Sequence, residues 1–257
     1  MGAISLLGKG STRMLFRFRA ALFAALPMLT VAVAPAHAGS GGALPDNDTM
    51  MKAMVEELVR SMDDLVLEDL PKPYFIQFNA EDRLTFSMRA AYGGLLNSAR
   101  DRFRVATSRV RVGSRELDNT NMGRGFGGRT ALPLDDDLTA LRHAIWRMAD
   151  VDYKRAVELL TRKQAFLKQK NVEDRPDDFS GAAPVVHIEP SPEISLDEVL
   201  WRHNVERLSG RFLDYPQIQD SSVSLFAGAV NNWVVTSEGT RLRTADTGAY
   251  LQIQART

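Results

Sequence analysis

The sequence predicts an α+β fold, a mostly antiparallel sheet with packed helices that is followed by the start of a second, mainly β section. In some segments apolar residues recur at three- and four-residue steps, as in helices, whereas in others they alternate with polar residues, as in strands. Short turns join the strand-like segments, which favours antiparallel pairing. A long proline-rich connection over residues 173–192 separates the two sections and places their boundary near residue 190.

The first predicted element is a helix over about residues 50–65, with Asp48 and Thr49 as its caps. Its apolar positions fall on one side of a helix, which is typical of a stripe that is buried against a core. The residues of this stripe are Met51, Met54, Val55, Leu58, Val59, Met62 and Leu65.

The pattern then changes to a period of two. Residues 74–78 and 84–90 are predicted to be strands, and the glycines at 93–94 interrupt them. A third strand is predicted over about residues 102–112.

The third strand has an apparent shift of face. Phe103 and Val105 fall on one face, whereas Val110 and Val112 fall on the other. One extra residue near 106–108 would restore a common face, so we expect a β-bulge there.

Helices are predicted next. Asp135–Asp137 suit the first turn of a helix that continues through Met148, and a second helix is expected over about 152–170. Ser195–Glu198 has the sequence of a capping box, which predicts a third helix as far as about Leu213.

The last segment returns to strands. Residues 223–229 alternate, Asn231-Asn232 is expected to turn the chain into residues 233–236, and Ser237-Glu238-Gly239 is expected to form a second hairpin turn. Residues 250–254 alternate again and end in a strand, from which we expect an adjoining domain. An open strand edge there also predicts poor solubility of the isolated chain.

The N-terminus has the three parts of a secretory signal peptide. Arginines at 13, 17 and 19 precede an apolar run over residues 20–34, and Pro35-Ala36-His37-Ala38 provides a small-x-small cleavage site. The apolar run is shorter than the roughly 20 residues that span a bilayer, although an uncleaved anchor is the alternative. We therefore expect export to the periplasm or the extracellular space, cleavage after Ala38 and no stable membrane anchor.

The predicted organisation has four parts: a signal peptide over 1–38, a flexible spacer over 39–49, an α+β domain over 50–190 and an incomplete section over 191–257.

Composition narrows the classes of function. Without the leader the chain has 28 basic and 32 acidic residues, a net charge of −4, so we expect no nucleic-acid partner. The chain has no cysteine, which excludes disulfides, thiolate metal sites and cysteine nucleophiles.

Histidines offer no complete metal site. Neither an H-E-x-x-H motif nor a histidine pair at i and i+4 occurs among His143, His187 and His203. The pairs His203/Glu206 and His187/Glu189 each supply two ligands, whereas a catalytic zinc needs three from the protein. Hydrogen-bonded or solvated polar pairs are the favoured interpretation.

Gly123, Gly125 and Gly128 form a G-x-G-x-x-G pattern. Dinucleotide binding requires these glycines between a strand and a helix N-terminus, but here they lie in a loop about ten residues after a strand. We interpret them as a glycine-rich loop.

Six arginines crowd one strand region. They form either a patch for an acidic peptide or partner, or an exposed sheet face and edge that is defended by charge, and we favour the second interpretation. No nucleophile motif is present either, so we assign no catalytic, cofactor-binding or metal residue. The six residues are Arg100, Arg102, Arg104, Arg109, Arg111 and Arg115.

Several phrases of the sequence together resemble the N-terminal region of exported TldD/PmbA-type proteins, over roughly residues 50–257. The resemblance implies an α+β N-terminal region, a mainly β middle section and a C-terminal catalytic domain. The phrases are Leu65–Pro73 with Tyr74-Phe75-Ile76, Val110–Gly113, Leu117–Asn121, Leu132–Asp137, Glu173–Ser180 and Ser237–Thr240.

The family is described as metallopeptidases whose H-E-x-x-x-H motif and a further ligand hold zinc, which activates water to attack a peptide carbonyl. No residue of this chain matches that motif, so no ligand is carried over and catalytic activity of this chain alone is uncertain. Zinc is implied for the full-length family only.

Three hypotheses follow. The first is the non-catalytic N-terminal portion of an exported TldD/PmbA-like zinc metallopeptidase, acting on a peptide or protein substrate. The second is a short exported module that binds peptide or a partner, as a homo-oligomer or with a TldD/PmbA-type subunit. The third is a self-sufficient enzyme that uses His143, His187 or His203.

Overall fold

The computed structural model describes residues 48–67, 70–122, 127–171, 175–192 and 194–257. The expected signal peptide and all of the expected spacer before residue 48 lie outside the described residues. Within the described ranges, no helix has both the length and the hydropathy that a membrane crossing requires.

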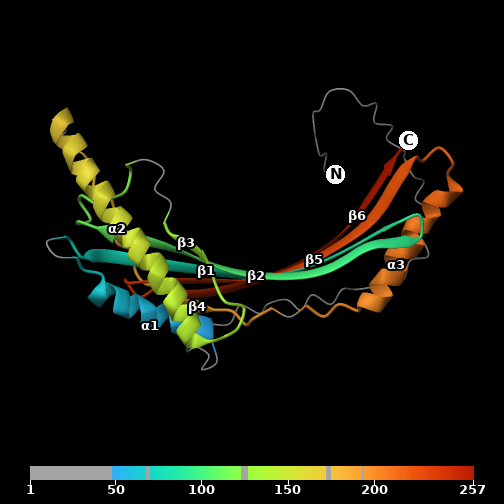
Figure 1. Cartoon of the computed structure of the whole chain (residues 1–257), viewed down its shortest axis with the longest axis horizontal. Helices are drawn as coiled ribbons and strands as arrows, with labels where there is room; N and C mark the ends of the chain where they lie inside the picture. Colours follow the sequence, from blue (N-terminus) through green and yellow to red (C-terminus); the bar gives the residue numbers. More distant parts are fainter. Residues whose placement is uncertain (1–47, 68–69, 123–126, 172–174, 193) are drawn as a thin grey trace. The chain divides into compact units, whose positions relative to one another are not determined.

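In the described part of the chain, a six-stranded sheet in the order β3-β2-β1-β5-β6-β4 forms the centre of the fold (Figure 1). Every neighbouring pair is antiparallel except β4 and β6, which are parallel. The sheet and its helices confirm the expected α+β class. The strands are β1 (Pro73–Ala91), β2 (Gly94–Val112), β3 (Arg129–Ala131), β4 (Val186–Ile188), β5 (Asp220–Thr236) and β6 (Arg241–Arg256).

Tight turns join the long strands. β1 passes into β2 through Tyr92 and Gly93, both with positive φ, and β5 passes into β6 through a turn that ends at Gly239. Both turns lie where the glycine signals predicted them. Because β1 also pairs with β5, segments from either side of residue 190 share one sheet. The expected division into two domains stays a prediction.

Within the described ranges three α-helices accompany the sheet: α1 (Thr49–Asp64), α2 (Leu138–Lys170) and α3 (Glu198–Gly210), which continues into the 3₁₀ helix η2 (Arg211–Asp214). α1 and α2 pack on each other and on the strands around a larger apolar core, which includes Ile76 and Phe78 of β1. α3 covers a smaller core, which includes Phe86 and Met88. Because successive residues of a strand point to opposite faces, all four side chains lie on one face of β1.

Between the two cores this face of the sheet is polar. Asp82 of β1 is buried and accepts hydrogen bonds from Arg102 and Arg104 of β2, and Arg104 also reaches Asp136 ahead of α2. Burial alone would raise the pKa of Asp82, but these two guanidinium groups hold it below its ordinary value. An ion-pair cluster therefore separates the two apolar cores.

Several sequence-based expectations are wrong. β2 pairs with β1 without interruption across residues 106–108, so no bulge lies there. The two helices expected over residues 135–170 are one continuous helix, α2. Asn231 and Asn232 pair within β5 and form no turn. The N-cap of α3 is Asp197, whose carboxylate accepts from the backbone N–H of Leu200 at 2.9 Å, instead of Ser195.

The incorrect prediction of a bulge in β2 has a physical reason. The buried face of β2 includes Arg104 and Ser108, whose partners are the carboxylates of Asp82 and Asp152, whereas Phe103 is 41% exposed on the other face. Because polar residues occupy part of the buried face, the apolar residues alone did not identify it. On α1, Asp48 is the N-cap as expected, but Val59 of the expected buried stripe is 59% exposed.

Candidate functional site

Most of the six arginines between residues 100 and 115, here called the arginine row, form ion pairs within the fold. Arg102 and Arg104 share Asp82, and the row makes further ion pairs with three acidic residues from different segments. Arg109 is exposed. The arginines therefore do not form one open patch for an anion. The remaining pairs are Arg100–Glu198 at 3.0 Å, Arg111–Asp118 at 2.6 Å and Arg115–Glu238 at 2.7 Å.

The densest polar network is built around Asp118, a fully buried carboxylate after β2. Its Oδ2 accepts from the Tyr74 hydroxyl at 2.7 Å and from Arg111 Nη1 at 2.6 Å. Its Oδ1 accepts from the backbone N–H of Thr120 at 2.8 Å and from the Thr120 hydroxyl. Both oxygens are thus fully used, and residues 118–120 are fixed against β1 and β2.

A second carboxylate, that of Asp178, extends this network. Asp178 Oδ2 accepts from the backbone N–H of Asp118 at 2.9 Å and from Lys163 Nζ at 2.6 Å, while Arg175 lies 3.3 Å away. Lys163 comes from α2 and also donates to the carbonyl of Thr120 at 2.8 Å. The segment after α2 is thereby tied to the loop after β2 and to the helix itself.

Aromatic rings enclose the Arg111 guanidinium. Its central carbon lies 4.2 Å from the ring centre of Phe179 and 5.8 Å from that of Phe75. The two rings are themselves 5.0 Å apart, centre to centre. Such cation–π contacts strengthen when the cation is shielded from water, as it is here.

The electrostatics of the network favour its charged form. Burial would raise the pKa values of Asp118 and Asp178, but hydrogen bonds and neighbouring cations outweigh burial and lower both pKa values. Burial, followed by the hydrogen bond to Asp118, raises the pKa of the Tyr74 hydroxyl. Groups that are held in one protonation state by fixed partners suit a structural role better than proton transfer. We identify this Asp118 network as a joint between segments.

The joint brings together most of the family-like phrases of the sequence. Tyr74 and Phe75, Arg111, Asp118 and Thr120, and Asp178 and Phe179 come from four separate phrases and meet in one network. Glu173 and Asp174 of the Glu173–Ser180 phrase lie outside the described residues. Sequence spacing gave no sign of this meeting, because Asp118 and Asp178 are 60 residues apart.

Asp152 of α2 is the group with the clearest shift toward neutral pH. Its Oδ2 accepts from the backbone N–H of Val110 at 2.9 Å and from the Ser108 hydroxyl at 3.2 Å. Burial raises the pKa of Asp152 to about 6, although these bonds and one from the Gly128 backbone work in the opposite direction. The carboxylate is buried and supports the outer edge of β2.

Close packing beside β2 explains one glycine of the G-x-G-x-x-G pattern. The carbonyl of Gly128 accepts from Ser108 N–H at 2.9 Å, and a Cβ at Gly128 would lie within about 3 Å of Met148 and of the Ser108 hydroxyl. Gly128 is therefore required by close packing beside β2. Gly123 and Gly125 lie outside the described residues.

The three histidines of the expected mature chain are separated. His187 and Glu189 are together, with Nε2 and Oε1 3.2 Å apart, and Glu189 also accepts from the backbone N–H of Ala245. His203 is exposed, and its neighbour Glu206 pairs with Arg202 instead. His143 is exposed on α2, its ring 5.9 Å from that of Trp146.

Zinc chemistry does not fit these residues. Within the part of the chain that the structure describes, no group of three or more histidine, aspartate or glutamate side chains is placed to hold a metal ion. We therefore derive no catalytic step through a metal.

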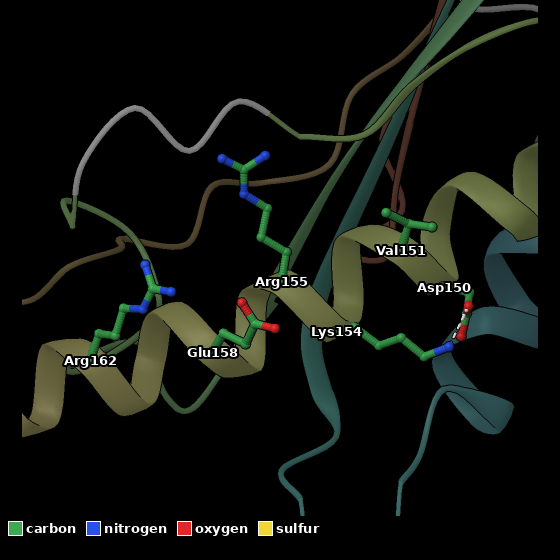
Figure 2. Close-up of a pocket in the computed structure, with 6 residues that line it drawn as sticks. All are labelled: Asp150, Val151, Lys154, Arg155, Glu158 and Arg162. Carbon is green, nitrogen blue, oxygen red and sulfur yellow. Dashed lines mark hydrogen bonds and ion pairs between the residues drawn. The ribbon is translucent and has the colours of Figure 1, made fainter.

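Two surface hollows lie along α2. One, of about 520 Å³, is formed by α2 alone. Figure 2 shows Lys154 directed to Asp150, with which it pairs at 2.7 Å, while the guanidinium groups of Arg155 and Arg162 project from the helix. Charges of both signs at successive turns are typical of a solvent-facing helix surface. This hollow offers no convergent polar groups.

The second hollow, of about 630 Å³, is a groove between α2 and β3, the strand at the edge of the sheet. β3 contributes Arg129, Thr130 and Ala131 on one side, and α2 contributes residues at helical spacing on the other. It is lined by Gly128, Arg129, Thr130, Ala131, Pro133, Ala140, His143, Ala144, Arg147, Met148 and Val151.

The part of β6 that follows residue 243 exposes apolar side chains. β5 pairs with β6 along its whole length, but in the described part of the chain the other edge of β6 has only β4, opposite residues 241–243. Beyond those residues Tyr250 is 62% exposed, Ile253 is 52% exposed and Leu251 is 38% exposed. Leu251 and Ile253 lie opposite Leu225 and Val223 of the smaller core, so they extend an apolar surface beyond it.

Solved structures similar to this chain include three long proteins. TldE from Thermococcus kodakarensis has a TM-score of 0.45 and 12% identity, covering 80% of this chain and 40% of that protein. A candidate modulator of DNA gyrase from Thermotoga maritima has a TM-score of 0.44 and 10% identity, covering 78% and 38%. One from Bacteroides thetaiotaomicron has a TM-score of 0.40 and 12% identity, covering 78% and 40%.

TldE belongs to the family that the sequence phrases resemble, so that family is represented among the structural neighbours. The chain spans about 40% of the length of the solved structures it matches. No family model and no curated protein matches the sequence.

Proposed function

We propose that this chain is an exported, non-catalytic module of a TldD/PmbA-like zinc metallopeptidase, which docks the metal-bearing part of the enzyme along β6. The observation that carries this proposal is the edge of β6, where exposed Tyr250, Leu251 and Ile253 accompany backbone that has no strand partner among the described residues. A strand edge with exposed apolar residues is a ready template for another strand. The occupant to which we commit is a metal-bearing TldD/PmbA-type subunit.

The division of labour follows from the residues. The conspicuous charged groups are engaged in ion pairs that hold segments together, and the sequence has no motif for a nucleophile or for zinc. Four of the six phrases that resemble the family build the Asp118 network, which is a structural joint. A role in binding is therefore better supported than a role in chemistry, and peptide hydrolysis would take place on the partner.

A co-purification experiment tests the proposal. The chain from residue 39 onward is produced together with the metal-bearing TldD/PmbA-type subunit from the same genome, and light scattering measures the mass of the complex. We expect a complex that is lost in the variant Ile253→Lys, because a charge cannot be buried against an apolar partner without a large cost. The matched control is Val59→Lys, which places the same charge at an equally exposed site on α1.

Peptidase assays on a mixed peptide library complete the test. The chain alone should release no products with added zinc, while the complex should. Equal association by the two lysine variants would refute docking along β6. Hydrolysis by the isolated chain with stoichiometric zinc would instead support a self-sufficient enzyme and overturn the non-catalytic role.

The alternative is a free-standing exported module that binds peptide without any catalytic partner. The groove between α2 and β3 is the feature that favours it. It would be supported if the chain bound peptide but formed no complex with a metal-bearing subunit.

A further inference from the structure

The groove between α2 and β3 combines a strand edge with a helix wall. β2 lies on one side of β3, and on its other side the described residues contain no further strand. The α2 wall includes residues at positions 140, 144, 148 and 151, the three- to four-residue spacing of one helix face, together with His143 and Arg147. Most of this wall is small or apolar, so a chain lying in the groove meets little obstruction.

The backbone of β3 carries N–H and C=O groups that face away from β2 and have no strand partner among the described residues. Leu132 N–H donates to the Arg104 carbonyl and the Gly128 carbonyl accepts from Ser108, so residues 128 and 132 face β2. In an antiparallel ladder the residues between them alternate, and the N–H and C=O groups of Arg129 and Ala131 therefore point away from β2. The carbonyl of Ala131 accepts from the Thr130 hydroxyl at 3.3 Å and keeps a second lone pair.

The charged residues that line the groove have one sign. Arg129 on β3 and Arg147 on α2 are both exposed, His143 lies one turn before Arg147, and no aspartate or glutamate is among the described residues that line the groove. This is unlike the first hollow on α2, where acidic and basic groups alternate. The groove thus offers guanidinium groups on both of its walls, a pattern that complements carboxylates.

We propose that this groove binds an acidic peptide segment in extended conformation, which adds to the edge of β3 as a further strand. Main-chain bonds to Arg129 and Ala131 would hold the peptide, and its carboxylates would pair with Arg129 and Arg147. Small or apolar side chains of the peptide would rest on Ala144 and Met148. This site is distinct from the edge of β6 and does not rest on docking of a catalytic subunit there.

Fluorescence anisotropy with a labelled octapeptide of alternating glutamate and valine tests the proposal on the chain from residue 39 onward. We expect saturable binding that weakens as salt is added, and no binding of the same peptide with lysine in place of glutamate. Arg147→Glu should weaken binding at least tenfold. The matched control Arg162→Glu makes the same charge change at an exposed position of α2 outside the groove and should change binding less than twofold.

Two further measurements separate strand addition from simple charge attraction. A peptide with N-methyl groups on alternate amides keeps its charge but cannot donate to β3, so its binding should also fall at least tenfold. Arg129→Glu, an exposed change on the other wall, repeats the test if Arg147→Glu reduces the helical circular dichroism signal. Equal weakening by the 147 and 162 variants, or undiminished binding of the N-methylated peptide, would overturn the proposal. The β6 variant Ile253→Lys should bind the peptide as the wild type does.

Discussion

Asp118 shows how much one side chain can organise in this fold. Its carboxylate accepts four hydrogen bonds from three residues, and its own backbone N–H donates to Asp178. A buried carboxylate is tolerated only when such partners replace its hydration. The buried carboxylate and its partners therefore depend on one another. Removing one of them leaves the others buried without a partner, which lowers the free energy of unfolding.

Replacement of Asp118 by asparagine should destabilise the protein by about 3 kcal/mol at neutral pH, as for other broken buried ion pairs. The amide supplies one acceptor oxygen, whereas the two carboxylate oxygens serve Thr120 on one side and Tyr74 with Arg111 on the other. Urea unfolding measures the change. The control Glu238→Gln breaks the more exposed pair with Arg115 and should cost less than about 1 kcal/mol. Equal losses in the two variants would contradict a central role for Asp118.

Gly113 ends β2 in a conformation that other residues rarely adopt. Its φ is +101°, and a Cβ there would lie 2.4 Å from the carbonyl oxygen of Leu117. We expect Gly113→Ala to cost about 2 kcal/mol of unfolding free energy, from backbone strain and this clash. Gly248→Ala on β6 is the matched control, because a Cβ there meets no atom within 4 Å. Thermal unfolding that is lowered equally in both variants would argue against the strain.

At this scale the sequence allowed some contacts to be anticipated and concealed others. Asp48 was recognisable as a cap because capping acts over three residues, and its Oδ1 does accept from Met51 N–H. Its other oxygen accepts from Trp233 and Arg243, which no local pattern indicates. The pairing of His187 with Glu189 was within reach because it is local. The Asp118 network was not, since its members come from four distant segments.

Among the elements, α2 departs most from its sequence pattern. The sequence pattern predicted two helices here, one through Met148 and a second over about residues 152–170, and aspartate is a poor residue for a helix interior. In the structure Asp152 is buried inside one continuous helix, where it accepts from Ser108 and Val110 of β2. A tertiary contact thus makes a poor helix former acceptable in the middle of a helix.

A proline at position 151 distinguishes one helix from two. In a continuous helix, Val151→Pro removes a backbone hydrogen bond and clashes with the preceding turn, which should cost about 3 kcal/mol or more. Between two separate helices the same change would be tolerated. Val151 is 63% exposed, so the control Val151→Ala should have little effect. Circular dichroism and urea unfolding check both variants, and an unchanged midpoint for the proline variant would contradict continuity.

The strands show a similar limit. β5 was expected to turn at Asn231-Asn232 because asparagine favours turns, yet both residues are paired on both sides by β1 and β6. The continuous pairing of two long neighbours outweighs the local preference. β3 and β4, with three residues each, were missed because segments so short show no alternation. The glycine turns were predicted well because positive φ is a strictly local requirement.

At the scale of the molecule, the described residues form one sheet that carries two apolar cores, and polar clusters lie beside these cores. The α+β class was predictable because the change of periodicity between helices and strands extends over many residues. Which charges would be buried was not, because opposite charges from distant segments neutralise each other only after folding. The same buried charges determine how the stability of the molecule depends on pH.

We expect stability to be highest at mildly acidic pH. The pKa values of Asp82, Asp118 and Asp178 are lowered in the native state, so the stability that they contribute is present above about pH 4 and is lost as the pH falls below it. The pKa of Asp152 is raised from 3.8 to about 6, so between those values the native state holds a proton that the unfolded chain releases. Stability should therefore fall as the pH rises from about 4 to 6.

Urea unfolding from pH 3 to 8 measures this profile. The variant Asp152→Asn keeps an acceptor for Val110 but cannot ionise, so it should lose the decline above about pH 4 and keep the acid limb. Parallel profiles of the two proteins between about pH 4 and 7 would show that Asp152 does not titrate as its burial requires.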